Sequence, residues 1–126
     1  MVKGRNAPEK RPRSKVLLSP SIVCADLLHL ERDIEALARF GVDLFHVDVM
    51  DGHFVRNFGF SYDLMRAVKS AVSIPLDAHL AVENPEVHVT LACEAGADII
   101  SFHPETSKDA AALVEETLRE LDASGA

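Results

Sequence analysis

The sequence predicts an α/β fold in which parallel strands alternate with helices. Short apolar runs of strand length recur along the chain, and each precedes a segment whose apolar residues follow helical spacing. Consecutive parallel strands need a crossover connection, usually a helix, so this alternation indicates a parallel sheet with right-handed crossovers. Polar residues also recur where the apolar runs end, and ligands of parallel α/β folds bind at that end of the strands.

Composition favours one folded domain and excludes some partners. The chain has 126 residues, of which 48% are hydrophobic and 26% charged, enough for a single core. The net charge of −7 argues against nucleic acid or an anionic membrane as the main partner. Cys24 and Cys93 lie far apart without a CxxC motif, so we expect a reduced, cytoplasmic protein in which both thiols are packing residues.

The N-terminal segment differs from the rest of the chain. Residues 1–14 contain five basic residues and two prolines, with almost nothing to bury. Such a segment cannot offset the entropy of folding, so we predict a disordered basic tail ahead of one domain at 15–126.

The first predicted strand and helix occupy residues 15–40. The strand runs from Lys15 to Val23, with Pro20 at a point where the ladder needs no amide donor. Asp26 is a suitable N-cap for the helix that follows, and Gly41 is a suitable stop after it.

The second predicted unit begins with Leu44–Met50, an apolar run that we expect to be buried on both faces, as parallel strands usually are. A loop at 51–60 follows. A helix then begins at Ser61 or Tyr62 and ends near Val72.

Two further units complete the pattern of four strands and four helices. The third strand is predicted at Ile74–Val82, and Asn84–Pro85 begins a helix that closes at Gly96. The fourth strand is predicted at Ala97–Pro104. Thr106 or Ser107 would cap the last helix, expected from Ala110 to Leu121.

The second strand contains an unusual pair of polar residues. His46, Asp48 and Met50 lie two apart and therefore share one face of the strand. An imidazole beside a carboxylate can share one metal ion or one proton, and burying such a pair for packing alone is costly. Alternatively, the two side chains simply hydrogen-bond each other or a loop. Ser21, His79 and His103 come at the ends of the other strands.

The residues at these strand ends resemble one known family, the ribulose-phosphate 3-epimerases. The similarity covers roughly residues 16–125 and depends on three motifs, Ser19–Ser21, His46–Val55 and Pro75–Leu80. The family fold is a TIM (β/α)8 barrel, which typically needs ~250 residues. The resemblance therefore implies the first four βα units, the N-terminal half, of such a barrel.

The resemblance also implies a reaction. It is the metal-assisted interconversion of D-ribulose 5-phosphate and D-xylulose 5-phosphate by proton transfer at carbon 3, part of the pentose phosphate pathway. His46, Asp48 and His79 would hold one divalent ion, and these ligands do not distinguish zinc, iron, manganese and cobalt. Asp48 would also be one of two acid/base carboxylates. The second, and the phosphate-binding glycine loops, belong to later strands, so we expect little or no turnover from this chain alone.

The resemblance implies that Ser21, Met50 and His79 contact the sugar-phosphate substrate. For each residue there is a structural alternative: Ser21 satisfies a strand end, Met50 is a core residue, and His79 is a hydrogen-bonded core histidine. His103 either lines the pocket or bonds the start of the last helix.

Several other polar residues receive structural interpretations. We expect Asp51 to hold loop amides at a turn, and His29 and His88 to face solvent on helices. Asp77 shares the face of His79 but begins its strand, which predicts a place low in the barrel, and His53 receives no role.

Two alternative functions remain open. The run Phe102–Thr106 and Cys24 resemble enzymes that act on a six-carbon ketose phosphate, allulose 6-phosphate. Alternatively, the chain is a non-catalytic half-barrel that self-associates, because an open sheet of four strands has two bare edges. On that ground we expect a homo-oligomer.

Overall fold

The computed structural model describes residues 16–125, and the predicted tail at 1–14 lies outside this range. Three parallel strands form one sheet in the order β1-β2-β3: β1 at Phe45–Met50, β2 at Leu76–Ala81 and β3 at Ile99–Phe102. Helices alternate with these strands, as the sequence pattern predicts. The chain is therefore an α/β protein with an open parallel sheet.

The predicted first strand, Lys15–Val23, is wrong as a regular strand. One bridge joins Ser21 to His46 of β1. The Pro20 oxygen accepts the His46 amide, and the Leu18 oxygen accepts the amides of the two residues just before β1. The chain then turns into a short 3-10 helix at Ile22–Cys24, because the Ser21 hydroxyl caps the Val23 amide. The segment accompanies β1 without forming a full ladder.

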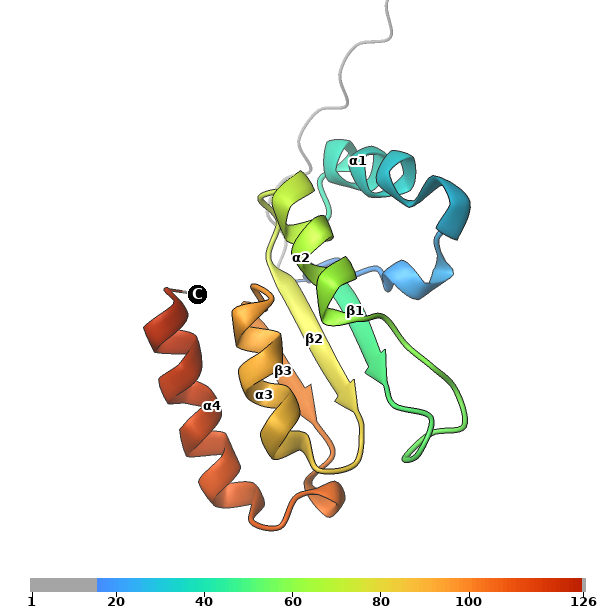
Figure 1. Cartoon of the computed structure of the whole chain (residues 1–126). Helices are drawn as coiled ribbons and strands as arrows, with labels where there is room; N and C mark the ends of the chain where they lie inside the picture. The colour runs from blue at the N-terminus through green and yellow to red at the C-terminus, as the bar shows by residue number, and fades with distance from the viewer. Residues whose placement is uncertain (1–15, 126) are drawn as a thin grey trace, which may run out of the picture.

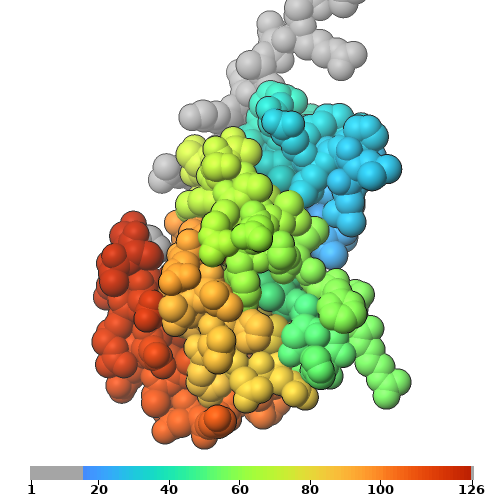
Figure 2. Space-filling model, viewed as in Figure 1, coloured from blue at the N-terminus to red at the C-terminus, as the bar shows by residue number. Residues whose placement is uncertain are grey.

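Four α-helices are placed along the sheet (Figure 1). They are α1 at Leu30–Phe40, α2 at Tyr62–Ala71, α3 at Pro85–Glu94 and α4 at Ala110–Ser124. In the view of Figure 1, α2 and α3 lie in front of the strands, and α4 lies at the left beyond α3. Figure 2 shows the same order on the molecular surface, with α4 packed along α3.

The helix ends agree with the predicted caps in part. The Ser61 hydroxyl accepts the Leu64 amide at the start of α2, and Gly41 ends α1 in the left-handed region at φ 81°. A 3-10 turn at Leu27–His29, capped by Asp26, precedes α1. The predicted cap of α4 is wrong: Asp109, closer to the helix than Thr106 or Ser107, accepts the Ala112 amide.

One face of the sheet forms the core. Phe45, Val47, Leu76, Ala78 and Leu80 are all fully buried. On the other face, the alternate residues of β1 and also Asp77 and His79 of β2 are only partly buried, so the expectation that β1 is buried on both faces is wrong. An open sheet covered by helices on one side leaves its other face accessible, and that face bears His46, Asp48 and His79.

Histidine 88 is not solvent-facing as predicted, whereas His29 is exposed. His88 is partly buried on α3, where its Nδ1 lies 2.6 Å from the hydroxyl oxygen of Tyr62 on α2. Burial lowers the pKa of His88 and raises that of Tyr62 to about 12, so the pair remains neutral near pH 7. This contact ties α2 to α3.

The two cysteines differ in environment. Cys93 is buried in the core and burial raises the pKa of its thiol, whereas Cys24 is exposed, so the prediction of two packing residues holds only for Cys93. We expect a disulfide reagent to modify one thiol in the native protein and two after denaturation. Cys24→Ser should abolish the native reaction; if the native protein of that variant still reacted rapidly, the placement of Cys93 would be wrong.

No helix among the described residues is long and apolar enough to cross a membrane.

Candidate metal centre

The site residues come from two neighbouring strands and the segment beside them. β1 supplies His46 and Asp48, β2 supplies His79, and the register places Asp48 opposite His79. Ser21 stands opposite His46 on the other side of β1. All four side chains project to the helix-free face, so the structure brings together the residues that the sequence predicted at these strand ends.

Asp48 lies at the centre of the group. Its Oδ1 is 3.2 Å from His46 Nε2 and 3.0 Å from His79 Nδ1, and its Oδ2 accepts a 2.7 Å hydrogen bond from Ser21 Oγ. Only 15% of the Asp48 side chain is exposed, against 27% for His46 and 30% for His79. The carboxylate is thus the most shielded member of a group that remains accessible.

The electrostatics keep Asp48 charged. Burial alone would raise the pKa of Asp48, but hydrogen bonds from His79 and Ser21 and the charges of His46 and His79 outweigh it and lower the pKa. For His46, burial opposes protonation, while the carboxylates of Asp77 and Asp48 overcome it and raise the pKa. Near neutral pH the site therefore presents a carboxylate able to accept a proton or bind a cation.

The donor set fits a divalent metal ion. One ligand atom from each of His46, Asp48 and His79 lies within 4.8 Å of the other two. Two imidazole nitrogens and one carboxylate oxygen suit zinc, iron(II), manganese or cobalt. Three protein ligands also leave coordination positions free for a substrate.

Asp77 is the residue that the sequence interpretation missed. Its Oδ2 lies 2.8 Å from His46 Nδ1, on the opposite side of the imidazole ring from Asp48. Asp77 is the second residue of β2, two positions before His79, and the register places it opposite His46. A carboxylate on the second nitrogen of a ligating histidine commonly orients the ring. The sequence did contain one indication of this role, because Asp77 lies two residues before His79 and so shares its face of the strand.

His103 follows β3 and joins the group from the other side. Its Nε2 lies 3.0 Å from His79 Nε2, and its ring contacts that of Phe54 in a tilted arrangement, with 4.7 Å between centroids. Its backbone oxygen also accepts bonds from the amide and hydroxyl of Thr106. The ring thus contacts the site, whereas the backbone bonds hold a 3-10 turn at Pro104–Thr106 and do not reach the start of the last helix, α4, which Asp109 caps.

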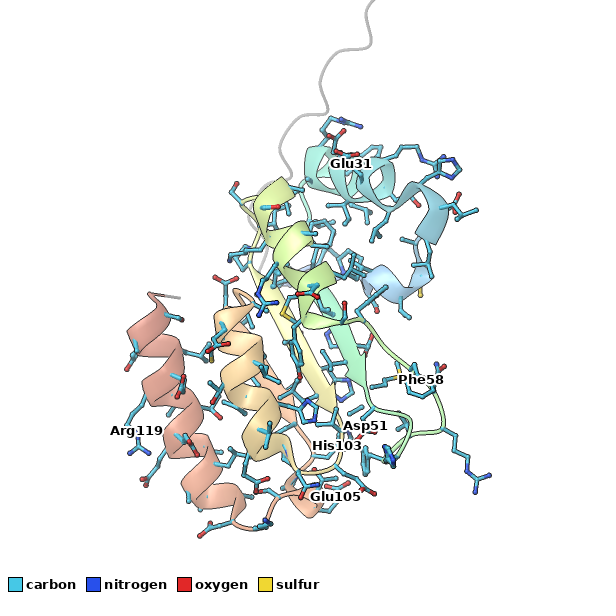
Figure 3. The ribbon with its side chains drawn as sticks, in the orientation of Figure 1. Glu31, Asp51, Phe58, His103, Glu105 and Arg119 are labelled. Atoms are coloured by element: carbon cyan, nitrogen blue, oxygen red, sulfur yellow. The ribbon has the colours of Figure 1, made fainter. Side chains whose placement is uncertain are left out.

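The loop after β1 is hydrogen-bonded to the loop after β2 at the ends of the strands. Asp51 accepts the amides of His53, Phe54 and Glu83, which confirms its predicted turn role and joins the loops after β1 and β2. Burial by itself would raise the pKa of Asp51, but these amides lower it. Figure 3 shows Asp51 and His103 near the arrowhead ends of the strands.

Met50, the remaining predicted site residue, lies at the end of β1 on the face of His46 and Asp48, partly buried. Its register partner on β2 is the buried Ala81. Met50 therefore lies next to the group along the strand, on the same face.

Comparison with known proteins identifies the chain. Residues 17–126 match the model of the ribulose-phosphate 3 epimerase family. The chain belongs to the ribulose-phosphate 3-epimerase family. It is 43% identical to ribulose-phosphate 3-epimerase of Aquifex aeolicus over 72% of this chain and 41% of that protein. It is 40% identical to the Bacillus subtilis enzyme over 71% of this chain and 42% of that one.

A plant relative in the same family is also similar. The chloroplastic ribulose-5-phosphate-3-epimerase of Arabidopsis thaliana is 37% identical over 83% of this chain and 37% of that protein. This member of the epimerase family thus spans about two fifths of the length of the relatives it matches. The fold of this family is a TIM barrel, and the open sheet of this chain corresponds to part of that barrel.

Gly59 allows the loop of this epimerase-family chain to pack against β1, the strand that bears His46 and Asp48. Its amide bonds the Met50 oxygen, and a Cβ at Gly59 would lie 2.3 Å from the Asp48 oxygen and 2.5 Å from the Met50 nitrogen. Because both obstacles are backbone atoms, we expect Gly59→Ala to displace the loop, cost about 1–3 kcal/mol and weaken cobalt binding. Calorimetric titration and urea unfolding would measure these effects.

Gly41→Ala is the matched control for Gly59→Ala. A Cβ at Gly41 meets no atom within 4 Å, but its positive φ makes any side chain unfavourable. We expect Gly41→Ala to lose about 1–2 kcal/mol of stability with unchanged cobalt affinity. Equal cobalt affinities of the two alanine variants would contradict the role assigned to Gly59.

Proposed function

We propose that this chain is the metal-binding, N-terminal part of a ribulose-phosphate 3-epimerase that interconverts D-ribulose 5-phosphate and D-xylulose 5-phosphate. The observation that supports it best is the convergence of His46, Asp48 and His79 within 4.8 Å, in a chain that belongs to this family. Epimerisation at carbon 3 removes a proton from one face and returns one to the other. It therefore needs a base beside the carbon and positive charge beside the carbonyl.

In this proposal His46, Asp48 and His79 hold one divalent ion, which supplies positive charge to stabilise the charge that develops on the substrate oxygens. Asp48 has the geometry and charge of the base: its lowered pKa keeps it ionised, and Ser21 fixes one of its oxygens. Ser21, Met50 and His79 surround the position of the sugar. Among the described residues Asp48 is the carboxylate that contacts both ligand histidines.

The proposal is tested with the purified chain, cobalt(II) and D-ribulose 5-phosphate in deuterated buffer. We expect the chain to bind one cobalt ion. We expect exchange of the carbon-3 hydrogen, measured by proton NMR, to be slow or barely detectable. Absence of saturable cobalt binding would contradict the proposal. Offering D-allulose 6-phosphate in parallel tests the six-carbon alternative, because faster exchange there would reassign the substrate.

A non-catalytic, self-associating half-barrel is the second candidate, and the exposed apolar side chains favour it. Leu28 and Phe40 on the α1 side are 90% and 71% exposed, and Leu118 on α4 is 59% exposed. In a self-associated form these side chains, together with the unpaired edges of the open sheet, would be available to a second copy of the chain. Sedimentation equilibrium discriminates: a discrete dimer that Leu118→Lys converts to monomer supports it, and a monomer at all concentrations contradicts it.

A further inference from the structure

We infer that His103 is a positioning residue for the metal centre: by accepting a hydrogen bond from His79 Nε2, it makes Nδ1 the nitrogen that His79 offers to the ion. This deepens the proposed function and rests on its metal site. The inference starts from the contact between two imidazoles, His79 Nε2 and His103 Nε2, at 3.0 Å.

A contact of this length between two ring nitrogens fixes their roles relative to each other. One nitrogen must donate a proton and the other must accept it, because two lone pairs or two protons would repel. The other nitrogen of His79, Nδ1, lies 3.0 Å from Asp48 Oδ1 inside the metal-binding group. A ligating nitrogen has no proton, so in the loaded site the single proton of neutral His79 lies on Nε2. His79 is then the donor, and His103 Nε2 is the acceptor.

The surroundings of His103 suit an acceptor at Nε2. If Nε2 accepts, the proton of neutral His103 lies on Nδ1, and that nitrogen is 3.4 Å from the Glu105 carboxylate. Phe54 packs on the ring and the Thr106 amide and hydroxyl bond the His103 backbone oxygen, so the imidazole is held in place. A proton on Nδ1 of His103 therefore faces a carboxylate, which favours the tautomer in which Nε2 is the acceptor.

The other ligand histidine, His46, also lies on a strand of the sheet, but it faces Asp48 through a different ring nitrogen from His79. His46 presents Nε2 to Asp48, and its Nδ1 faces the Asp77 carboxylate at 2.8 Å. The two histidines thus offer opposite ring nitrogens to one centre, and each has a different partner on its outer nitrogen. For His46 that partner is a carboxylate, and for His79 it is another imidazole.

His103 is a poor candidate for a direct ligand. Its Nε2 meets the side of the His79 ring that faces away from Asp48, and the group of ligand atoms within mutual reach comprises His46, Asp48 and His79 among the described residues. While Nε2 accepts from His79, its lone pair is already engaged. The effect of His103 on the metal must therefore pass through the His79 ring.

The test compares three substitutions at His103. His103→Gln places an amide oxygen near the position of Nε2 and retains an acceptor, His103→Asn places its oxygen near Nδ1 instead, and His103→Leu removes both. Removal of an outer partner of a metal ligand typically costs 10–100-fold in affinity. We expect cobalt(II) affinity, measured by calorimetry, to fall about 10–100-fold in the Leu and Asn variants and to stay within about threefold in the Gln variant.

A spectroscopic measurement separates positioning from packing. In the zinc-loaded wild type, nitrogen-15 NMR of the imidazoles should show His79 with a protonated Nε2 and a ligated Nδ1, and the Gln variant should preserve this pattern. His29→Gln is the control. His29 is exposed and its ring pairs with Asp26, so this substitution should leave cobalt affinity unchanged. Helical circular dichroism confirms that each variant folds.

Each remaining outcome has a definite meaning. Wild-type affinity in His103→Leu, equal losses in the Gln and Leu variants, or a ligated Nε2 on His79 would each overturn the inference while leaving the proposed function intact. No cobalt binding by the wild type would overturn the proposed function and the inference together.

Discussion

Asp48→Asn should lower cobalt(II) affinity by more than about 100-fold, a larger loss than outer partners of a metal typically cause. The substitution removes the negative charge that His46 and His79 both contact, and it replaces one carboxylate oxygen by an amide NH2 group, which does not bind a cation. Any carbon-3 hydrogen exchange should be lost as well, because an amide is not a base. Calorimetric titration and NMR exchange measure the two effects.

The same variant tests the direction of the Asp48 pKa. Because the folded-state pKa is lowered, the ionised carboxylate stabilises the metal-free fold above the unfolded pKa of about 3.9, and this contribution is lost as the pH falls through the folded value. Asp48→Asn should therefore lose less stability than the wild type between pH 5 and the acid end of the titration, judged by urea unfolding at each pH.

Asp63→Asn is the control for the Asp48 substitution. Asp63 lies on α2 with 92% of its side chain exposed, and it forms an ion pair with Arg66 on the same helix. We expect unchanged cobalt affinity in this variant. Asp48→Asn with an affinity within threefold of the wild type would remove Asp48 from the metal centre.

Phe45→Ala should destabilise the protein by about 3–5 kcal/mol. Phe45 begins β1, is fully buried, and is among the largest side chains of the core. Domains of ordinary stability have about 5–15 kcal/mol in total, so this loss should leave a substantial unfolded fraction at 25 °C. Urea unfolding followed by circular dichroism at 222 nm measures the change.

Phe40→Ala removes the same side chain from a site with 71% exposure at the end of α1. Surface substitutions of this kind usually change stability by no more than about 0.5 kcal/mol. Comparable losses in the Phe40 and Phe45 variants would mean that the core is not where the structure places it.

The sequence predicted the position of β1 and the alternation of its side chains, although not the partial exposure of one face. Phe45 and Val47 alternate with His46 and Asp48, and that alternation is the observed division between the core face and the site face. The first strand failed for a local reason. Ser21 bonds the amide of Val23 and starts a 3-10 turn, a competition between side chain and ladder that an apolar run does not reveal.

The site was predictable as a set of strand ends but not as a set of contacts. Parity within each strand places His46 with Asp48 on one face of β1, and Asp77 with His79 on one face of β2. The register of β1 and β2 decides that Asp77 stands opposite His46, and a shift of two residues would have separated them. Register depends on packing between strands far apart in sequence, which explains why Asp77 received no role.

The central position of β2 has a consequence for amide hydrogen exchange. β2 is bonded to β1 on one edge and β3 on the other, and Leu76, Ala78 and Leu80 are fully buried. Amides of this strand should exchange with solvent only when the whole domain opens, whereas those of β3, with Ile99 42% exposed, should exchange through local fraying. His79 thus sits on the slowest-exchanging element, and its ring is anchored for as long as the domain stays folded.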